Sequence, residues 1–229
     1  MTIKVFDDLI QGSEDWLEAR RGVLTASEMH LILTPTLKVA ANDKTRAHVY
    51  ELAAQRISQY VEPHHISDDM IRGHQDEASA VYLYSEKIAP VQQVGFITRQ
   101  FGDFQIGYSP DGLVGDDGLL EVKSRRQKYQ VQTIAELLPA NQIAPEYVMQ
   151  AQTGLLVTGR KWLDHISYCG GLPMAVVRVF PDTAIQDAIL NAATAFEAKV
   201  KQVIASYEAN SRGLLPTERV IELGHEMII

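Results

Sequence analysis

The segment from residue 91 to residue 123 constrains the fold most, because its hydrophobic pattern has the period of strands while the chain on either side has the period of helices. Residues 91–98, 104–109 and 119–123 are rich in apolar and β-branched side chains, and glycine-containing turns separate them. Strands placed between helical stretches predict an α/β fold, in which helices cover both faces of a mixed central sheet.

Capping residues begin four helices in the first third of the chain. They are Ser13, Thr25 with Glu28 in a capping box, Asn42 or Asp43, and Ser67. The fourth of these helices is predicted over residues 68–87. Beyond the strands, the pattern predicts helices over 127–138, 145–157 and 182–209, and a hairpin of strands 161–168 and 175–180.

The length of 229 residues, with 46% apolar and 22% charged residues, is typical of one globular domain. We divide it into a helical part (13–87), a sheet (91–180), a C-terminal helix (182–209) and a tail (210–229). No apolar run is long enough to cross a bilayer and the first residues lack a signal-peptide pattern, so we expect a cytoplasmic protein without a membrane partner. The single cysteine, Cys169, excludes an internal disulfide and is expected to be a buried apolar residue of a strand.

Two carboxylates, Asp111 and Glu121, are placed to face each other across a hairpin. If the chain turns at residues 115–118, position 111 pairs with position 121, and paired side chains have Cβ atoms about 5 Å apart. Carboxylates that close repel each other unless a cation lies between them, and Mg²⁺ is the usual cation for oxygen ligands. The hairpin therefore predicts a divalent-metal site.

The residues after Glu121 add to this site. Glu121 and Lys123 are two apart on a strand, so both project from one face, where an ammonium group can orient or deprotonate a water. The carbonyl of Val122 is available as a further ligand. The alternative is an exposed hairpin with cross-strand ion pairs. Apolar Leu119, Leu120 and Val122 favour an interior strand, where an unpaired glutamate is costly.

Five short motifs follow one another along the chain. They are Arg20-Arg21-Gly22-Val23-Leu24-Thr25-Ala26-Ser27-Glu28, Gly73-His74-Gln75-Asp76-Glu77, Ser109-Pro110-Asp111-Gly112-Leu113, Leu120-Glu121-Val122-Lys123 and Tyr147-Val148-Met149-Gln150-Ala151-Gln152. In type and order they resemble the lambda-type exonucleases, also called YqaJ-like viral recombinases, of the PD-(D/E)xK nuclease superfamily. The resemblance extends from about residue 13 to residue 157.

The resemblance implies a restriction-endonuclease-like core and a set of catalytic residues. This set is Glu77, Asp111, Glu121, Lys123 and Gln150. Two Mg²⁺ ions, with Mn²⁺ as the alternative metal, would be bound by Asp111, Glu121, the Val122 carbonyl and Glu77. Lys123 would position the attacking water, and Gln150 would help to place that water or the scissile phosphate.

The family's site for the terminal 5′-phosphate corresponds to Arg20, Ser27 and Ser109. An anion site has independent physical support there, because Ser27 lies in the first turn of a capped helix and Arg20 can bind an anion with two donors. The family's apolar wedge, which separates the terminal base pair, falls seven residues before Glu77, at Met70. The alternative for Met70 is a core methionine at the start of a helix.

The implied function is a Mg²⁺-dependent 5′→3′ exonuclease that digests double-stranded DNA from its ends to 5′-mononucleotides and leaves 3′ single-stranded overhangs for single-strand annealing. The family also implies a homotrimeric ring and an annealing-protein partner. Two alternatives remain: an endonuclease on the same core, and a non-enzymatic protein that binds DNA ends as a recombination scaffold. A serine hydrolase is excluded, because Pro110 after Ser109 has no backbone N–H for an oxyanion.

The chain departs from the family pattern after Lys123, where Ser124-Arg125-Arg126 replaces the frequent Cys-Pro. The loop 35–46 and the tail after Arg212 do not align with the family. The net charge of −8, taken alone, argues against a DNA partner. Its distribution does not, because basic residues concentrate in segments 20–56 and 121–128. We expect a basic track on an otherwise acidic surface.

Overall fold

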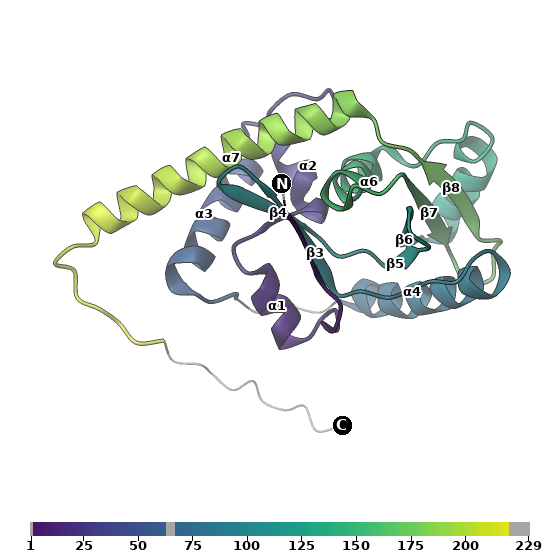
Figure 1. Cartoon of the computed structure of the whole chain (residues 1–229), viewed down its shortest axis with the longest axis horizontal. Coiled ribbons are helices and arrows are strands. Elements are labelled where there is room, and N and C mark those ends of the chain that lie inside the picture. Colours follow the sequence, from purple (N-terminus) through teal and green to yellow (C-terminus); the bar gives the residue numbers. More distant parts are fainter. Residues whose placement is uncertain (1, 63–66, 220–229) are drawn as a thin grey trace, which may run out of the picture.

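Two four-stranded mixed sheets carry the fold of the computed structural model, which describes residues 2–62 and 67–219 (Figure 1). The first has the order β1(Ile3–Phe6), β3(Phe96–Phe101), β4(Phe104–Tyr108), β2(Leu24–Thr25). The second has the order β5(Gly112–Val114), β6(Gly118–Ser124), β7(Trp162–Tyr168), β8(Ala175–Val179). Each sheet contains one parallel pair, β2 with β4 and β6 with β7, so the predicted α/β class with mixed pairing is confirmed.

Helices surround both sheets. They are α1(Glu14–Arg20), the 3₁₀ helix η1(Ala26–Glu28), α2(Met29–Ile32), α3(Asp43–Ser58), α4(Asp68–Lys87), α5(Gln127–Gln132), the π-helix η2(Thr133–Leu137), α6(Pro145–Thr158) and α7(Thr183–Asn210). The predicted caps are confirmed: the side chains of Ser13, Asn42 and Ser67 each accept a backbone N–H of the helix that follows. Asp182 caps α7 in the same way. The capping box of Thr25 and Glu28 also forms.

The predicted strand at 91–98 is wrong in its first half, because residues 91–95 pass from one sheet to the other. Gln92 exchanges backbone hydrogen bonds with Leu113 of the second sheet, while Gly95 donates to Phe6 of the first. The crossing is tight: a Cβ at Gly95 would lie 2.1 Å from the carbonyl oxygen of Leu9. Regular pairing starts only at Phe96, and the short strands β1, β2 and β5 were not predicted.

Helix α6 lies between the two sheets and contacts strands of both, while α4 covers β6 and β7 (Figure 1). The larger core cluster joins α6 to the first sheet and to α2, α3 and α7. A smaller cluster joins Ala80 and Tyr84 of α4 to Leu120, Val122 and Ile166 of the second sheet. The hairpin of β5 and β6, with the two carboxylates predicted to face each other, is therefore an interior element held between two helices.

Other predictions concern the ends of elements and the tail. Cys169 is buried as a free thiol directly after β7. No helix in the described part of the chain is long and apolar enough to span a membrane. The apolar end of the tail, residues 227–229, lies outside the described residues, as do the two histidines at 64 and 65.

Candidate active site

The hairpin of β5 and β6 brings Asp111 and Glu121 together as predicted. The pairing of Gly112 with Leu120, continued by one residue, places these two carboxylates opposite each other, and the Asp111 N–H donates to the Leu120 carbonyl at 3.2 Å. Oδ2 of Asp111 accepts the backbone N–H of Val122 at 2.5 Å. Because the register follows from the position of the turn, local sequence was sufficient to predict this pair.

Glu121 is 2% exposed and accepts hydrogen bonds from three side chains. Oε1 accepts from Lys123 Nζ at 2.7 Å and from Gln150 Nε2 at 2.5 Å. Oε2 accepts from the hydroxyl of Tyr108 at 2.6 Å. Lys123 comes from the same strand, Tyr108 from the end of β4 and Gln150 from α6, so three elements converge on one carboxylate.

The charges in this cluster shift its proton equilibria. Burial, followed by the negative charges of Glu121 and Glu77, raises the pKa of Asp111 well above its usual range. Burial also raises the pKa of Glu77. Burial lowers the pKa of Lys123, but the carboxylates of Glu121 and Asp111 outweigh it and leave the pKa raised, so the ammonium form is favoured.

The donor set suits a hard cation. Two facing carboxylates whose charges repel are relieved by a divalent ion, and Mg²⁺ is commonly bound by one or two carboxylates with water and substrate phosphate completing its shell. Among the described residues, no three or more His, Cys, Asp or Glu side chains form a group that could hold a metal ion alone. Glu77 is close enough to Asp111 and Glu121 for their negative charges to interact, but these three carboxylates do not form a metal-binding group by themselves.

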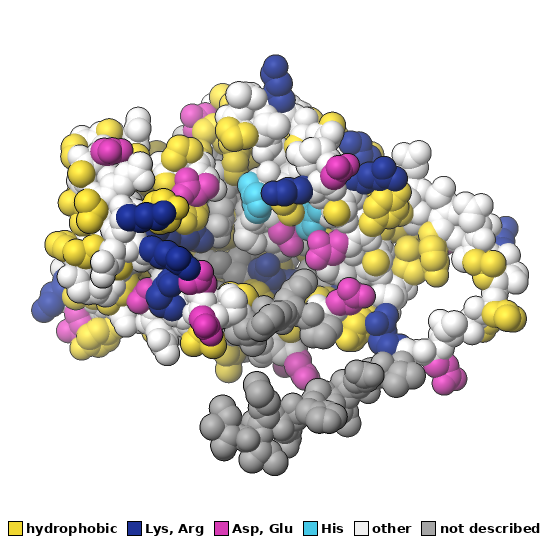
Figure 2. Space-filling view, turned by 180° about the vertical axis from the view of Figure 1, so that it is seen from behind, with side chains coloured by type: hydrophobic (Ala, Val, Ile, Leu, Met, Phe, Trp, Pro, Cys, Tyr) yellow, Lys and Arg dark blue, Asp and Glu magenta, His cyan; other side chains and the backbone are white. Residues whose placement is uncertain are grey.

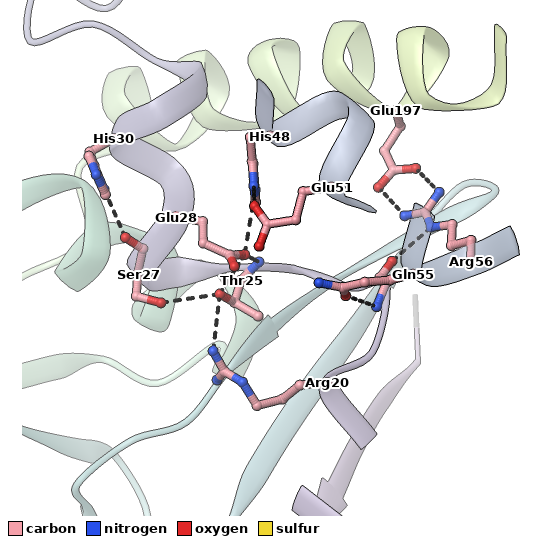
Figure 3. A network of polar contacts seen from close by, with 11 residues as sticks. Arg20, Thr25, Ser27, Glu28, His30, His48, Glu51, Gln55, Arg56 and Glu197 are labelled. Atoms are coloured by element: carbon pink, nitrogen blue, oxygen red, sulfur yellow. Dashed lines mark hydrogen bonds and ion pairs between the residues drawn. The ribbon is translucent and has the colours of Figure 1, made fainter. Parts of the chain in front are cut away.

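The three residues predicted to bind a 5′-phosphate also come together, beside the carboxylates. Arg20 Nη1 donates to Ser109 Oγ at 3.0 Å, and Arg20 Nη2 donates to Thr25 Oγ1 at 3.4 Å. Thr25 Oγ1 lies 3.2 Å from Ser27 Oγ (Figure 3). Ser109 is two residues before Asp111, so this polar cluster continues directly along the chain into the carboxylate hairpin.

The hydroxyl protons in this polar cluster can be assigned. Ser109 Oγ accepts from Arg20 and from Trp16 Nε1 at 3.0 Å, so its own proton is available to an incoming anion. Thr25 donates to Glu28 at 2.8 Å, because a carboxylate only accepts, and Ser27 is then the donor to Thr25. Burial lowers the pKa of Arg20, although the charge of Glu28 opposes this.

Met70 lies on the first turns of α4 and is 46% exposed, so the alternative of a core methionine is wrong. Its neighbour Ile71 is 49% exposed. An exposed apolar pair on the helix that carries Glu77 is compatible with a wedge.

Sequence reasoning missed three residues of the site: Tyr108, Trp16 and Thr25. Trp16 stacks on the Arg20 guanidinium at 4.2 Å and also hydrogen-bonds Ser109. A tyrosine at the buried end of a strand needs a partner for its hydroxyl, which was the available signal for Tyr108. Nothing in the sequence around Trp16 indicates its partners, which are 79 and 93 residues away.

Comparisons with known proteins identify the family of this chain. The family model of the YqaJ-like viral recombinase domain matches residues 15–161. The alkaline exonuclease LHK-Exo from Laribacter hongkongensis has a TM-score of 0.76 and 30% identity, covering 89% of this chain and 100% of that chain. The structure of LHK-Exo in complex with dAMP has a TM-score of 0.75 and 31% identity, and it covers 89% of this chain and 100% of that chain.

A phage-related exonuclease from Haemophilus somnus 129PT has the same fold, with a TM-score of 0.57 and 13% identity over 80% of this chain and 96% of that chain. A comparison with curated proteins found no match. The domain family matches more than half of the chain, and the similarity to LHK-Exo extends over nearly all of it. The resemblance found in the motifs is therefore confirmed, and this chain belongs to the YqaJ-like viral recombinase family, which groups with the lambda-type alkaline exonucleases.

Proposed function

We propose that this protein is a Mg²⁺-dependent exonuclease that digests double-stranded DNA in the 5′→3′ direction, releases 5′-mononucleotides and leaves 3′ overhangs. The observation that carries the proposal is the convergence of Tyr108, Lys123 and Gln150 on Glu121, opposite Asp111. LHK-Exo, the relative with 30% identity, is an alkaline exonuclease, and its complex contains a mononucleotide, dAMP.

Asp111, Glu121 and the Val122 carbonyl would hold the metal, with Glu77 as a further ligand. When bound, Mg²⁺ supplies positive charge that stabilises the attacking and leaving oxygens of an in-line displacement. Lys123, kept as an ammonium by its contact with Glu121, orients a water beside the scissile phosphate. Gln150, held at the same oxygen of Glu121, offers an amide that positions this water or the phosphate.

Arg20, Ser27 and Ser109 would bind the terminal 5′-phosphate, because the Arg20 guanidinium contacts the Ser109 hydroxyl directly and is linked to the Ser27 hydroxyl through Thr25. The exposed Met70 would part the terminal base pair. Assembly as a homotrimer and delivery of the 3′ strand to a single-strand annealing protein belong to the same proposal, and they rest on family membership alone.

Digestion of linear and covalently closed circular duplex with Mg²⁺ tests this function. We expect the linear DNA to be converted to mononucleotides and the circle to survive. Cleavage of the circle would instead support an endonuclease on this core. Binding of DNA ends without cleavage of either substrate, with Mg²⁺ or Mn²⁺, would support a scaffold and overturn the proposal.

A further inference from the structure

A pocket of about 400 Å³ lies beside the candidate active site, and the mechanism above does not use it. Its charged lining consists of Arg72, Asp76, Arg125 and Arg126, and Cys169 and Gly170 form part of its wall. The pocket therefore contains three guanidinium groups and one carboxylate. It lies where the parallel strands β6 and β7 both end, at Ser124 and Tyr168.

The pocket is built on the two elements that carry the catalytic residues. Arg72 and Asp76 precede Glu77 on α4, and Arg125 and Arg126 follow Lys123 closely along the chain. Ser124 joins the two sides: its hydroxyl donates to Asp76 at 2.5 Å and accepts from Arg72 Nε at 3.3 Å. The pocket is therefore held at a fixed position relative to Lys123.

The arginines differ in how firmly they are held. Arg125 is buried, donates to the Tyr147 hydroxyl at 2.7 Å and to Glu146 at 3.2 Å, and stacks over Tyr129 and Tyr147. Arg72 and Arg126 share one carboxylate, Asp69, at 2.7 Å and 3.0 Å.

The side chains that share this contact are exposed: 41% for Arg72, 64% for Arg126 and 57% for Asp69. An exposed ion pair of this kind contributes little stability, so a stronger anion can replace Asp69 at modest cost.

We propose that this arginine pocket binds a phosphodiester group of the DNA backbone, one that lies next to the scissile position; the proposal rests on the proposed function. The planar guanidinium group with several donors matches a phosphate better than a lysine does. Figure 2 shows Lys and Arg side chains gathered among acidic ones on the half of the molecule that contains α4 and β5–β8, next to a hollow in this face. The competing interpretation is a purely structural ion-pair network that fastens α4 to the end of β6.

The test compares Arg126→Ala with a matched control, Lys161→Ala. Both residues are exposed cations, at 64% and 73%, and each pairs with an exposed aspartate, Asp69 or Asp117. Lys161 lies at the opposite end of the same two strands, where it pairs with the turn before β6. Both substitutions remove one positive charge, so any difference between them reports on position.

Binding of linear duplex DNA is measured without divalent metal at several salt concentrations. Loss of one phosphate contact lowers the slope of log K against log salt by about 0.9 in magnitude. We expect this decrease for Arg126→Ala, recovery of the slope in Arg126→Lys, and an unchanged slope for Lys161→Ala. An unchanged slope in Arg126→Ala, or an equal decrease in Lys161→Ala, would overturn the proposal.

Steady-state cleavage separates this proposal from the proposed function. With Mg²⁺ present, Arg126→Ala is expected to raise KM several-fold while kcat stays within about twofold, because the lost contact contributes uniform binding. A fall in kcat at constant KM would contradict a backbone contact. If the unaltered protein fails to digest DNA but the binding slopes behave as expected, the exonuclease function fails and DNA binding by the arginine pocket stands.

Discussion

The hydroxyl of Tyr108 donates a hydrogen bond of 2.6 Å to Oε2 of Glu121, and both side chains are almost fully buried. At neutral pH tyrosine is the donor and the carboxylate accepts, so the contact orients one oxygen of Glu121. The other oxygen is held by Lys123 and Gln150. Burial, then the charge of Glu121 and the hydrogen bond to it, raise the pKa of Tyr108 and preserve this donor role.

Substitution Tyr108→Phe should weaken metal binding. Removal of an outer hydrogen bond to a ligating carboxylate typically lowers metal affinity by about 10- to 100-fold. Isothermal titration with Mn²⁺ measures the effect without catalysis. Tyr84→Phe is the matched control, since Tyr84 donates at the same distance, 2.6 Å, to the buried Asp164. Equal losses in both variants would show a general effect on the fold and contradict a specific role for Tyr108.

Substitution Gly154→Ala should destabilise the protein, because α6 packs directly on the Tyr108 ring at this position. A Cβ at Gly154 would lie 2.7 Å from that ring. Overpacking of this kind costs about 1–3 kcal/mol of unfolding free energy. Gly73→Ala is the control, since Gly73 is also helical but a Cβ there would meet no atom within 4 Å, and alanine should stabilise by up to about 1 kcal/mol. Urea denaturation measures the unfolding free energy of both variants. A Gly154→Ala variant as stable as the unaltered protein would refute tight packing of α6 on the Tyr108 ring.

Substitution Asp111→Ala should abolish cleavage and retain DNA binding. The facing carboxylate of Glu121 remains, but the cation site loses one of the two carboxylates of the pair. Digestion of linear duplex with Mg²⁺ measures cleavage, and a mobility shift in EDTA measures binding. Asp116→Ala, in the turn of the same hairpin, provides a control that keeps the pair. Normal cleavage by Asp111→Ala would eliminate the proposed metal site.

Substitution Arg20→Ala should remove a preference for 5′-phosphorylated ends. In the unaltered protein we expect a 5′-phosphorylated duplex to be digested faster than a 5′-hydroxyl duplex, because Arg20 and Ser109 present donors to the phosphate. Arg21→Ala is the neighbouring control; Arg21 pairs instead with Glu18 and Gln59. Initial rates on the two duplexes provide the measurement. Equal rates in the unaltered protein would count against a 5′-phosphate site at Arg20, Ser27 and Ser109.

Much of the local structure was predictable from the chain alone. The caps at Ser13, Asn42 and Ser67 depend on a side chain and a backbone N–H three residues away, so local sequence suffices. The pairing of Asp111 with Glu121 likewise depends on the position of one turn. Residues 91–95 show the limit of this reasoning, since their composition is that of a strand but they connect two sheets.

The α/β class, the helix starts and the facing carboxylates could be predicted from the sequence, because each depends on neighbours close in the chain. The distant groups that complete the sites became visible only in the folded structure. Arg20 meets Ser109 across 89 residues, Gln150 meets Glu121 across 29, and Arg72 meets Ser124 across 52. Such contacts depend on how the two sheets and α4 and α6 pack, and packing is decided by the burial of the whole apolar core, which no short motif records.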